Sequence, residues 1–260
     1  MLFDTHCHLD MIFDAHNRLL SVRNQLDNKQ FEENTNQIIN NAYKKSVKKI
    51  LIPAIKPGIS KINIKNIFLA AGSHPYHADE TIGKKNKIIN ALDKAVAIGE
   101  TGLDFFKCPV SKDAQIESLR FQCELAIEKN LPIILHERNS FQELVSVIKD
   151  YPGIKGVFHA FHHSEKELNE IIKLGFFVGL GGMVTYKKNE KLREAIQNGP
   201  INHFLLETDS PYLPPQSRRG TINEPKNLLE IAEYIATLKN LDLKEIASAT
   251  TANANRLFNL

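Results

Sequence analysis

The feature that most constrains the fold is a series of eight short apolar runs separated by charge-rich segments. The runs are MLFD (1–4), KILIPAI (49–55), IFLAAG (67–72), AVAIGE (95–100), PIILHE (132–137), GVFHAF (156–161), FFVGL (176–180) and HFLLETD (203–209). Several are continuously apolar and rich in β-branched or aromatic residues, which is typical of strands buried on both faces. Parallel strands need crossover connections, usually helices. The alternation therefore predicts an α/β protein with a (β/α)8 TIM-type barrel.

The segments between the runs carry helical patterns. Residues 113–130 place apolar side chains at spacings of three and four, as an amphipathic helix does. Residues 164–175 begin with Ser164 and Glu167, which form a capping-box pattern, and end at Gly175, a typical helix terminator. Two further helices are expected over residues 223–240 and 243–260, the first with a proline near its start.

One connection is too short for a normal crossover. Only residues 56–66 separate the second and third runs, and this segment contains Pro57 and Gly58. A full helix barely fits there, so a degenerate second crossover is expected. No internal repeat or linker divides the chain of 260 residues, and residues 1–260 are interpreted as one domain.

Bulk properties indicate an ordinary soluble protein. The formal net charge of +3 is compatible with an anionic substrate but is far from the signature of a nucleic-acid-binding domain by itself. The three cysteines are widely spaced and form no CxxC motif, which favours a reducing compartment. No signal segment or membrane-spanning run is recognisable, so a cytoplasmic protein without membrane association is expected.

Imidazole and carboxylate side chains recur where the apolar runs end. They are His6, His8, His74, Glu100, Asp104, His136, His159, Glu207 and Asp209. In a barrel of parallel strands, all of them would lie at the carboxyl-terminal mouth, where such barrels place their chemistry. A single histidine at a strand end is more often structural than a ligand. Even with His74 set aside, ligand-type residues at five strand ends are difficult to explain by coincidence.

These residue types suit a metal site. In an extended chain, His6 and His8 point to one side and Cys7 to the other, although an HxH pair alone is weak evidence. Four histidines with Glu100 and Asp209 would suffice for two cations, and the two oxygens of Glu100 make it the natural bridge. The set is His6, His8, Glu100, His136, His159 and Asp209. Two such cations can clamp a phosphoryl group and activate a water molecule.

Glu207 is open to two interpretations. It shares a face with Asp209 by the period-two rule, which makes it a candidate acid of the site, either behind the metal ligands or in contact with substrate. The alternative is a salt bridge beneath the barrel mouth.

The order of motifs resembles the TatD family of metal-dependent deoxyribonucleases, within the amidohydrolase superfamily. The motifs are THCHLD, GSHP, IGETGLDF, LPIILHER, GVFHAF, LLETDSPYL, RRGTINEP and TANANRLF, which together cover essentially the whole chain. The resemblance implies a barrel hydrolase that cuts phosphodiester bonds of DNA, in many members from the 3′ end. DNA, single-stranded or at 3′ ends, is then the expected partner.

The resemblance also assigns roles to residues. It implies the same six metal ligands, two divalent ions (Mg, Mn or Zn), and a phosphate contact for His74. Arg138, Arg219 and Asn223 match family positions that line the mouth. Asp209 is expected to orient the attacking water and accept its proton, so the expected catalytic residues are Asp209, Glu100 and His74.

Two departures from the family pattern affect loops rather than ligands. HAFHHSE stands where the family usually has His-Cys-Phe or His-Gly-Phe followed by Ser-Gly, and Arg218-Arg219-Gly220 replaces His-Arg-Gly. Basic side chains near the mouth, expected to steer the DNA backbone or to be plain surface charge, are Lys107, Lys187, Lys188, Arg218 and Arg219.

Two other functions fit the same residues. A related hydrolase acting on another ester or amide, such as an aminoacyl-tRNA deacylase, would use the same centre. A metal or nucleic-acid binder without catalytic activity would be expected to lack ligands, and none of the six is missing.

Overall fold

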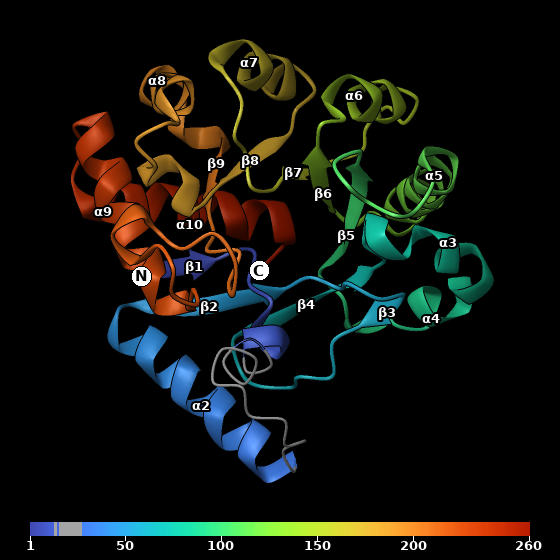
Figure 1. Ribbon diagram of the computed structural model, residues 1–260, viewed down its shortest axis with the longest axis horizontal. Helices are drawn as coiled ribbons and strands as arrows, with labels where there is room; N and C mark the ends of the chain where they lie inside the picture. The colour runs from blue at the N-terminus through green and yellow to red at the C-terminus, as the bar shows by residue number, and fades with distance from the viewer. Residues whose placement is uncertain (13–14, 16–27) are drawn as a thin grey trace.

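The computed structural model describes residues 1–12, 15 and 28–260 and shows a nearly closed barrel of eight parallel strands (Figure 1). The strands follow the order β1-β2-β4-β5-β6-β7-β8-β9. They are β1 (Leu2–Asp4), β2 (Val47–Ile52), β4 (Ile67–Gly72), β5 (Ala97–Asp104), β6 (Ile133–Arg138), β7 (Gly156–Phe158), β8 (Phe177–Leu180) and β9 (Phe204–Leu206). The predicted (β/α)8 fold class is therefore confirmed.

The first and last strands meet through the segments that follow them. The Thr5 N–H donates to the Leu206 carbonyl at 3.0 Å, and the Asp209 N–H donates to the His6 carbonyl at 2.8 Å. Cys7 then forms an isolated parallel bridge with Ser210. These bonds bring residues from the two ends of the chain to one point of the barrel mouth.

Helices cover the outside of the strands, and α5 to α9 follow one another around the barrel (Figure 1). The longer helices are α2 (Asn28–Lys44), α5 (Lys112–Lys129), α6 (Phe141–Lys149), α7 (Glu165–Lys173), α8 (Glu190–Asn198), α9 (Leu228–Lys239) and α10 (Leu243–Phe258). Within the described ranges, no helix has the length and apolar character needed to cross a membrane.

The helix predictions hold with small changes at the ends. Helix α7 begins with the predicted capping box, because Ser164 and Glu167 exchange side-chain and backbone hydrogen bonds. The segment expected to be helical from residue 223 instead starts as a 3-10 turn over Pro225–Asn227, and α9 begins at Leu228. Proline lacks an N–H donor and is tolerated only in a first turn, which places it in this lead-in.

The second crossover is degenerate, as expected. Between β2 and β4 the chain forms β3 (Gly58–Ile59), which pairs antiparallel with the end of β4. Residues 53–66, all of which the structure describes, contain no helix. The next connection is built from the short helices α3 (Ala78–Thr81) and α4 (Lys85–Ile89) and from 3-10 turns such as Pro75–His77.

The barrel interior is filled by one apolar side chain from each strand. They are Phe3, Leu51, Ala70, Ala97, Ile134, Val157, Phe177 and Leu205. From α10, Ala254, Leu257 and Phe258 join this cluster. Full burial of each large apolar side chain contributes about 1.5–3 kcal/mol, so this layer anchors the strands. Because it fills the amino-terminal part of the barrel, the polar residues further along each strand meet at the other end.

Candidate metal centre

Seven predicted site residues meet at the carboxyl ends of the strands. His6 and His8 follow β1, His74 follows β4, Glu100 lies within β5, His136 lies within β6, His159 follows β7 and Asp209 follows β9. All seven are in contact with at least one other member, and His6, His8, Glu100, His159 and Asp209 are each at least 90% buried. The topology brings together groups that are up to 203 residues apart because parallel strands end at the same edge.

Glu100 divides this group into two halves. Its Oε2 lies 3.1 Å from His6 Nε2 and 3.5 Å from His8 Nε2. Its Oε1 lies 2.8 Å from both His136 Nδ1 and His159 Nε2. Each carboxylate oxygen thus faces its own pair of imidazole nitrogens. Asp209 belongs to the first half, where its Oδ1 lies 3.5 Å from His8 Nε2 and 3.8 Å from His6 Nε2.

The spacing within each pair fits a shared cation. His6 Nε2 and His8 Nε2 are 3.3 Å apart, and His136 Nδ1 and His159 Nε2 are also 3.3 Å apart. Two nitrogens each bound about 2.1 Å from a tetrahedral ion are separated by about 3.4 Å. Imidazole and carboxylate donors are the ligands of Zn, Mn and related ions, so the donor set fits divalent metal ions.

The carboxylates of the centre are held in their charged form. Burial alone would raise the pKa of Glu100, but the neighbouring His159, His6 and His74 hold it well below its usual value. Burial likewise opposes ionisation of Asp209, yet the hydrogen bond from His8 and the nearby His159 and His6 lower its pKa. Burial disfavours a charged His159, and the adjacent Glu100 and Glu207 overcome this and raise its pKa well above the usual value. Opposite charges therefore stabilise one another at the mouth.

His74 differs from the other histidines. Burial lowers its pKa to about 3, and the nearby imidazoles add to this effect, so the ring is neutral at pH 7. The Tyr76 N–H donates to His74 Nδ1 at 3.1 Å, which leaves the ring proton on Nε2. This Nε2 lies 3.5 Å from Glu100 Oε1. His74 therefore presents a neutral N–H donor to the centre rather than a positive charge.

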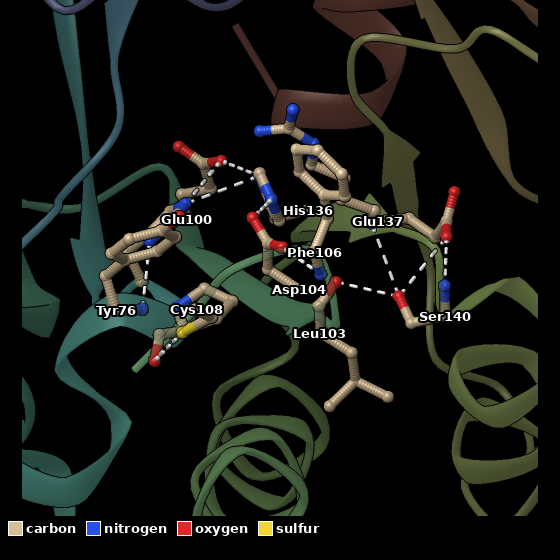
Figure 2. Close-up of polar contacts among 12 residues, drawn as sticks. Tyr76, Glu100, Leu103, Asp104, Phe106, Cys108, His136, Glu137 and Ser140 are labelled. Atoms are coloured by element: carbon tan, nitrogen blue, oxygen red, sulfur yellow. Dashed lines mark hydrogen bonds and ion pairs between the residues drawn. The ribbon is translucent and has the colours of Figure 1, made fainter. Parts of the chain in front are cut away.

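Two carboxylates orient the histidines from behind. Asp104 Oδ2 lies 3.2 Å from His136 Nε2, with Glu100 on the other side of the ring (Figure 2). Glu207 Oε1 lies 3.7 Å from His159 Nδ1 and accepts the Ala160 N–H at 2.5 Å. The hydrogen bond with Asp104 fixes the proton of His136 on Nε2, whereas the longer contact of Glu207 acts on His159 through charge alone. No role was assigned to Asp104 from the sequence. Its even spacing from Glu100 along β5 indicates that both side chains point to the same face of the strand.

Two glycines make room for these side chains. Gly102 pairs with His136 across β5 and β6, has φ +143°, and an added Cβ would lie 2.0 Å from the His136 carbonyl oxygen. A Cβ on Gly179 would lie 1.9 Å from Glu207 Oε2. The strands can approach the centre this closely only because these positions have no side chain.

The centre lies at the bottom of a cavity of about 630 Å³. Histidine and carboxylate side chains line it together with Met11, Tyr76, Arg138, Met183 and Tyr212. Arg138, the last residue of β6, stacks its guanidinium over the Phe106 ring at 4.2 Å. Arg138 thus lines the cavity above the centre, and its contact with substrate stays a prediction.

Three residues predicted to bind substrate are absent from the lining of the cavity: Glu207, Asn223 and Arg219. Glu207 is 1% exposed and lies behind His159, so it contacts a proposed ligand but does not line the cavity. Asn223 is fully buried and donates to the carbonyls of Thr208 and Tyr212, which ties down the loop after β9.

The basic residues of the same loop also have partners outside the cavity. Arg219 stacks over the Tyr186 ring at 4.7 Å. Arg218 pairs with Glu230 at 3.1 Å. The motif RRGTINEP therefore shapes the rim through internal contacts, which a linear pattern cannot distinguish from substrate contacts.

A family model described as "TatD related DNase" matches residues 3–259. The chain belongs to this family. Over 199 residues it is 40% identical to the Bacillus subtilis protein named "Uncharacterized metal-dependent hydrolase YabD", a match that covers 75% of this chain and 78% of that protein. Over 200 residues it is 36% identical to "3'-5' ssDNA/RNA exonuclease TatD" of Erwinia tasmaniensis, with 73% and 77% covered.

Solved structures agree with this membership. The crystal structure of YJJV, a TatD homolog from Escherichia coli K12, matches with a TM-score of 0.82 at 28% identity and covers 100% of this chain and 98% of that chain. The resemblance inferred from the motifs is thus confirmed, and the protein is a TatD-family metal-dependent hydrolase. In this TatD-family barrel, the paired imidazoles on either side of Glu100 form the candidate metal centre.

Proposed function

We propose that this TatD-family protein hydrolyses phosphodiester bonds of single-stranded DNA from the 3′ end, using two divalent metal ions. The observation that carries the proposal is the division of Glu100, with one carboxylate oxygen facing each pair of imidazole nitrogens. A carboxylate between two ligand pairs is the arrangement that holds two ions close together.

The ligand set divides between the ends of the chain. His6, His8 and Asp209 would hold one ion, His136 and His159 the other, and Glu100 would be shared. The chemistry that divalent cations supply at such a site is polarisation of phosphoryl oxygens and acidification of a water molecule. Mn or Zn suits four imidazoles better than Mg does on grounds of ligand softness.

Three side chains have distinct tasks in this proposal. Asp209 is ionised at neutral pH because its pKa is lowered by His8 and its neighbours, so its carboxylate can accept the proton of the attacking water. The neutral His74 would donate a hydrogen bond from its Nε2–H to a non-bridging phosphate oxygen. Arg138, at the cavity wall, would pair with the next phosphate along the strand.

Aromatic side chains at the rim support a single-stranded substrate. Tyr76 is 39% exposed and Tyr212 is 49% exposed, and both line the cavity. Phe106, 36% exposed, lies under Arg138, which also lines the cavity. Unpaired bases stack on such rings, whereas paired bases are already stacked within a duplex. The relative from Erwinia tasmaniensis is named a 3'-5' ssDNA/RNA exonuclease, which agrees with this choice.

The proposal is tested by comparing substrates on one preparation. Purified protein is incubated with Mg, Mn or Zn and with a 5′-labelled single-stranded DNA, the same strand blocked at its 3′ end, and its duplex. Laddered products from the free 3′ end only, slower on the duplex, are expected. An equal rate on the blocked strand would contradict exonuclease action.

Parallel reactions with aminoacyl-tRNA and p-nitrophenyl esters test the other bonds that the same centre could cleave. Cleavage of these substrates without cleavage of DNA would replace the proposal by an amidohydrolase-type esterase or deacylase. The three cysteines are free, as expected in a reducing compartment. We therefore propose that residues 1–260 form a single domain that works in the cytoplasm.

A further inference from the structure

A second group of side chains of the kinds that bind metal ions lies at the rim of the cavity, outside the centre described above. It consists of Glu137 from β6 and of His162 and His163 from the loop between β7 and α7, and is called the rim cluster here. One ligand atom from each of the three lies within 4.8 Å of the other two. Glu137 lies within the motif LPIILHER, but the proposed reaction gives no role to any of the three residues.

The rim cluster is separate from the main centre. Glu137 directly follows His136 on β6, so the two side chains leave the strand on opposite faces. Figure 2 shows Glu137 directed away from His136 and toward Ser140. An ion held at the rim cluster would therefore share no ligand with the pairs around Glu100.

The three donor atoms are already close together. Glu137 Oε2 lies 2.5 Å from His163 Nε2 and 3.9 Å from His162 Nε2. The two imidazole rings lie 4.2 Å apart at 30° to one another. Two histidines and one glutamate form the three-ligand set of open zinc sites, in which solvent or substrate takes the remaining position.

Hydrogen bonds outside the cluster leave its donor atoms available. His162 Nδ1 lies 3.0 Å from the Ala160 carbonyl, which cannot donate, so this nitrogen carries the proton and Nε2 keeps its lone pair. Glu137 Oε1 accepts the Ser140 N–H at 2.7 Å, which leaves Oε2 toward the histidines. Glu137 is only 8% exposed, so its position is fixed by packing.

We propose that the rim cluster binds a further divalent cation of the Zn class, through Glu137, His162 and His163. Glu137 and His162 both line the cavity, so the open coordination positions face the space that substrate enters. Without a cation, Glu137 places a negative charge beside an anionic substrate. With a cation bound, the rim becomes positive and can hold a phosphate oxygen. This role in substrate binding rests on the proposed function, whereas the binding of the cation to the rim cluster does not.

The test measures metal content rather than activity. Untagged protein is stripped with chelator, dialysed to equilibrium against Zn²⁺ and analysed by elemental mass spectrometry. The variant His162→Ala/His163→Ala is expected to bind one equivalent fewer than the wild type and to keep the rest. The control His203→Ala removes a histidine that lies 3.0 Å from the Phe176 carbonyl, far along the chain from the cluster, and is expected to lose none. Equal zinc content in wild type and double variant would overturn the proposal.

A second measurement covers the case of a variant that does not fold. Glu137→Gln keeps an oxygen for the Ser140 N–H and removes the charged ligand, and His162→Asn changes only a partly exposed side chain. With Co²⁺ in place of Zn²⁺, both are expected to lose part of the visible d–d absorption and to bind the last equivalent at least tenfold more weakly. Unchanged spectra and titrations in these folded variants would contradict the proposal, whatever the result of the nuclease assay.

Discussion

Asp104 and Glu100 hold the two nitrogens of one imidazole: His136 Nε2 lies 3.2 Å from Asp104 Oδ2, and His136 Nδ1 lies 2.8 Å from Glu100 Oε1. The first contact keeps the proton on Nε2, so that Nδ1 faces the centre with its lone pair. Asp104 therefore acts through His136 and is a positioning residue.

Asp104→Asn is expected to weaken metal binding about 10–100-fold, because a neutral amide orients His136 less firmly than a carboxylate. Titration of chelator-stripped protein with Zn²⁺ or Mn²⁺ measures this directly. At saturating metal, most of the hydrolytic rate is expected to return, which a loss of fold would not allow. The exposed Asp93→Asn serves as the matched control. An affinity equal to that of the wild type would rule out the positioning role.

Glu100→Gln is expected to disable both halves of the centre at once. The amide removes the charge that all the surrounding imidazoles face, so metal affinity should fall by more than the roughly 10–100-fold cost of losing an outer contact. Metal analysis and hydrolysis measured on the same sample check this. Glu128→Gln, an exposed carboxylate paired with Lys129, is the control. Retention of two tightly bound ions in Glu100→Gln would contradict the bridging role.

Gly102→Ala is expected to destabilise the fold by more than about 4 kcal/mol, since the new Cβ would have to displace the His136 carbonyl, 2.0 Å away, from a strand of the barrel. Gly153→Ala is the matched control: its φ is +88°, and nothing lies within 4 Å of the added Cβ. The unfavourable φ alone should cost it about 1–2 kcal/mol. Urea unfolding compares the two, and equal losses would show that the close approach at Gly102 is unimportant.

Asp4 is expected to make stability fall as pH rises. Burial raises the pKa of Asp4 to about 8, even though Thr208 donates two hydrogen bonds to its carboxyl group. Because the unfolded carboxyl titrates near 3.8, the folded state binds more protons between about pH 4 and pH 8, and the free energy of unfolding falls across this window. The slope from this group approaches at most about 1.4 kcal/mol per pH unit.

Asp4→Asn tests this directly, because an amide resembles the protonated acid and does not titrate. Urea midpoints of the chelated protein at pH 5 to 9 are expected to decline less steeply in the variant than in the wild type. Parallel declines in the two proteins would show that Asp4 is ionised in the folded state throughout.

The strands of the barrel could be predicted because each is buried on both faces, so that the pattern of apolar residues carries the fold. Their carboxyl ends could be predicted less well. Strand β5 continues past Glu100 to Asp104, because glycines at 99 and 102 let polar and small residues remain in the sheet, and an apolar run does not reveal that.

The candidate ligands could be predicted because each follows an apolar run, and parallel topology gathers strand ends. The substrate residues could not. Arg219 and Asn223 lie in a loop whose path depends on contacts with Tyr186, Thr208 and Tyr212. The rim cluster cannot be predicted from the sequence for the same reason, since the meeting of its histidines with Glu137 depends on the turn at Ala160, where φ is +49°.

The closure between β1 and β9 joins proposed ligands from opposite ends of the chain. His6 and His8 are among the first residues made, while Asp209, whose N–H bonds to the His6 carbonyl, is added only after four fifths of the chain. A chain that ends before Asp209 therefore carries five of the six proposed ligands and lacks the one that lies beside the start of the barrel. Assembly of the complete proposed ligand set is therefore tied to closure of the barrel, because its last member follows the strand that meets β1.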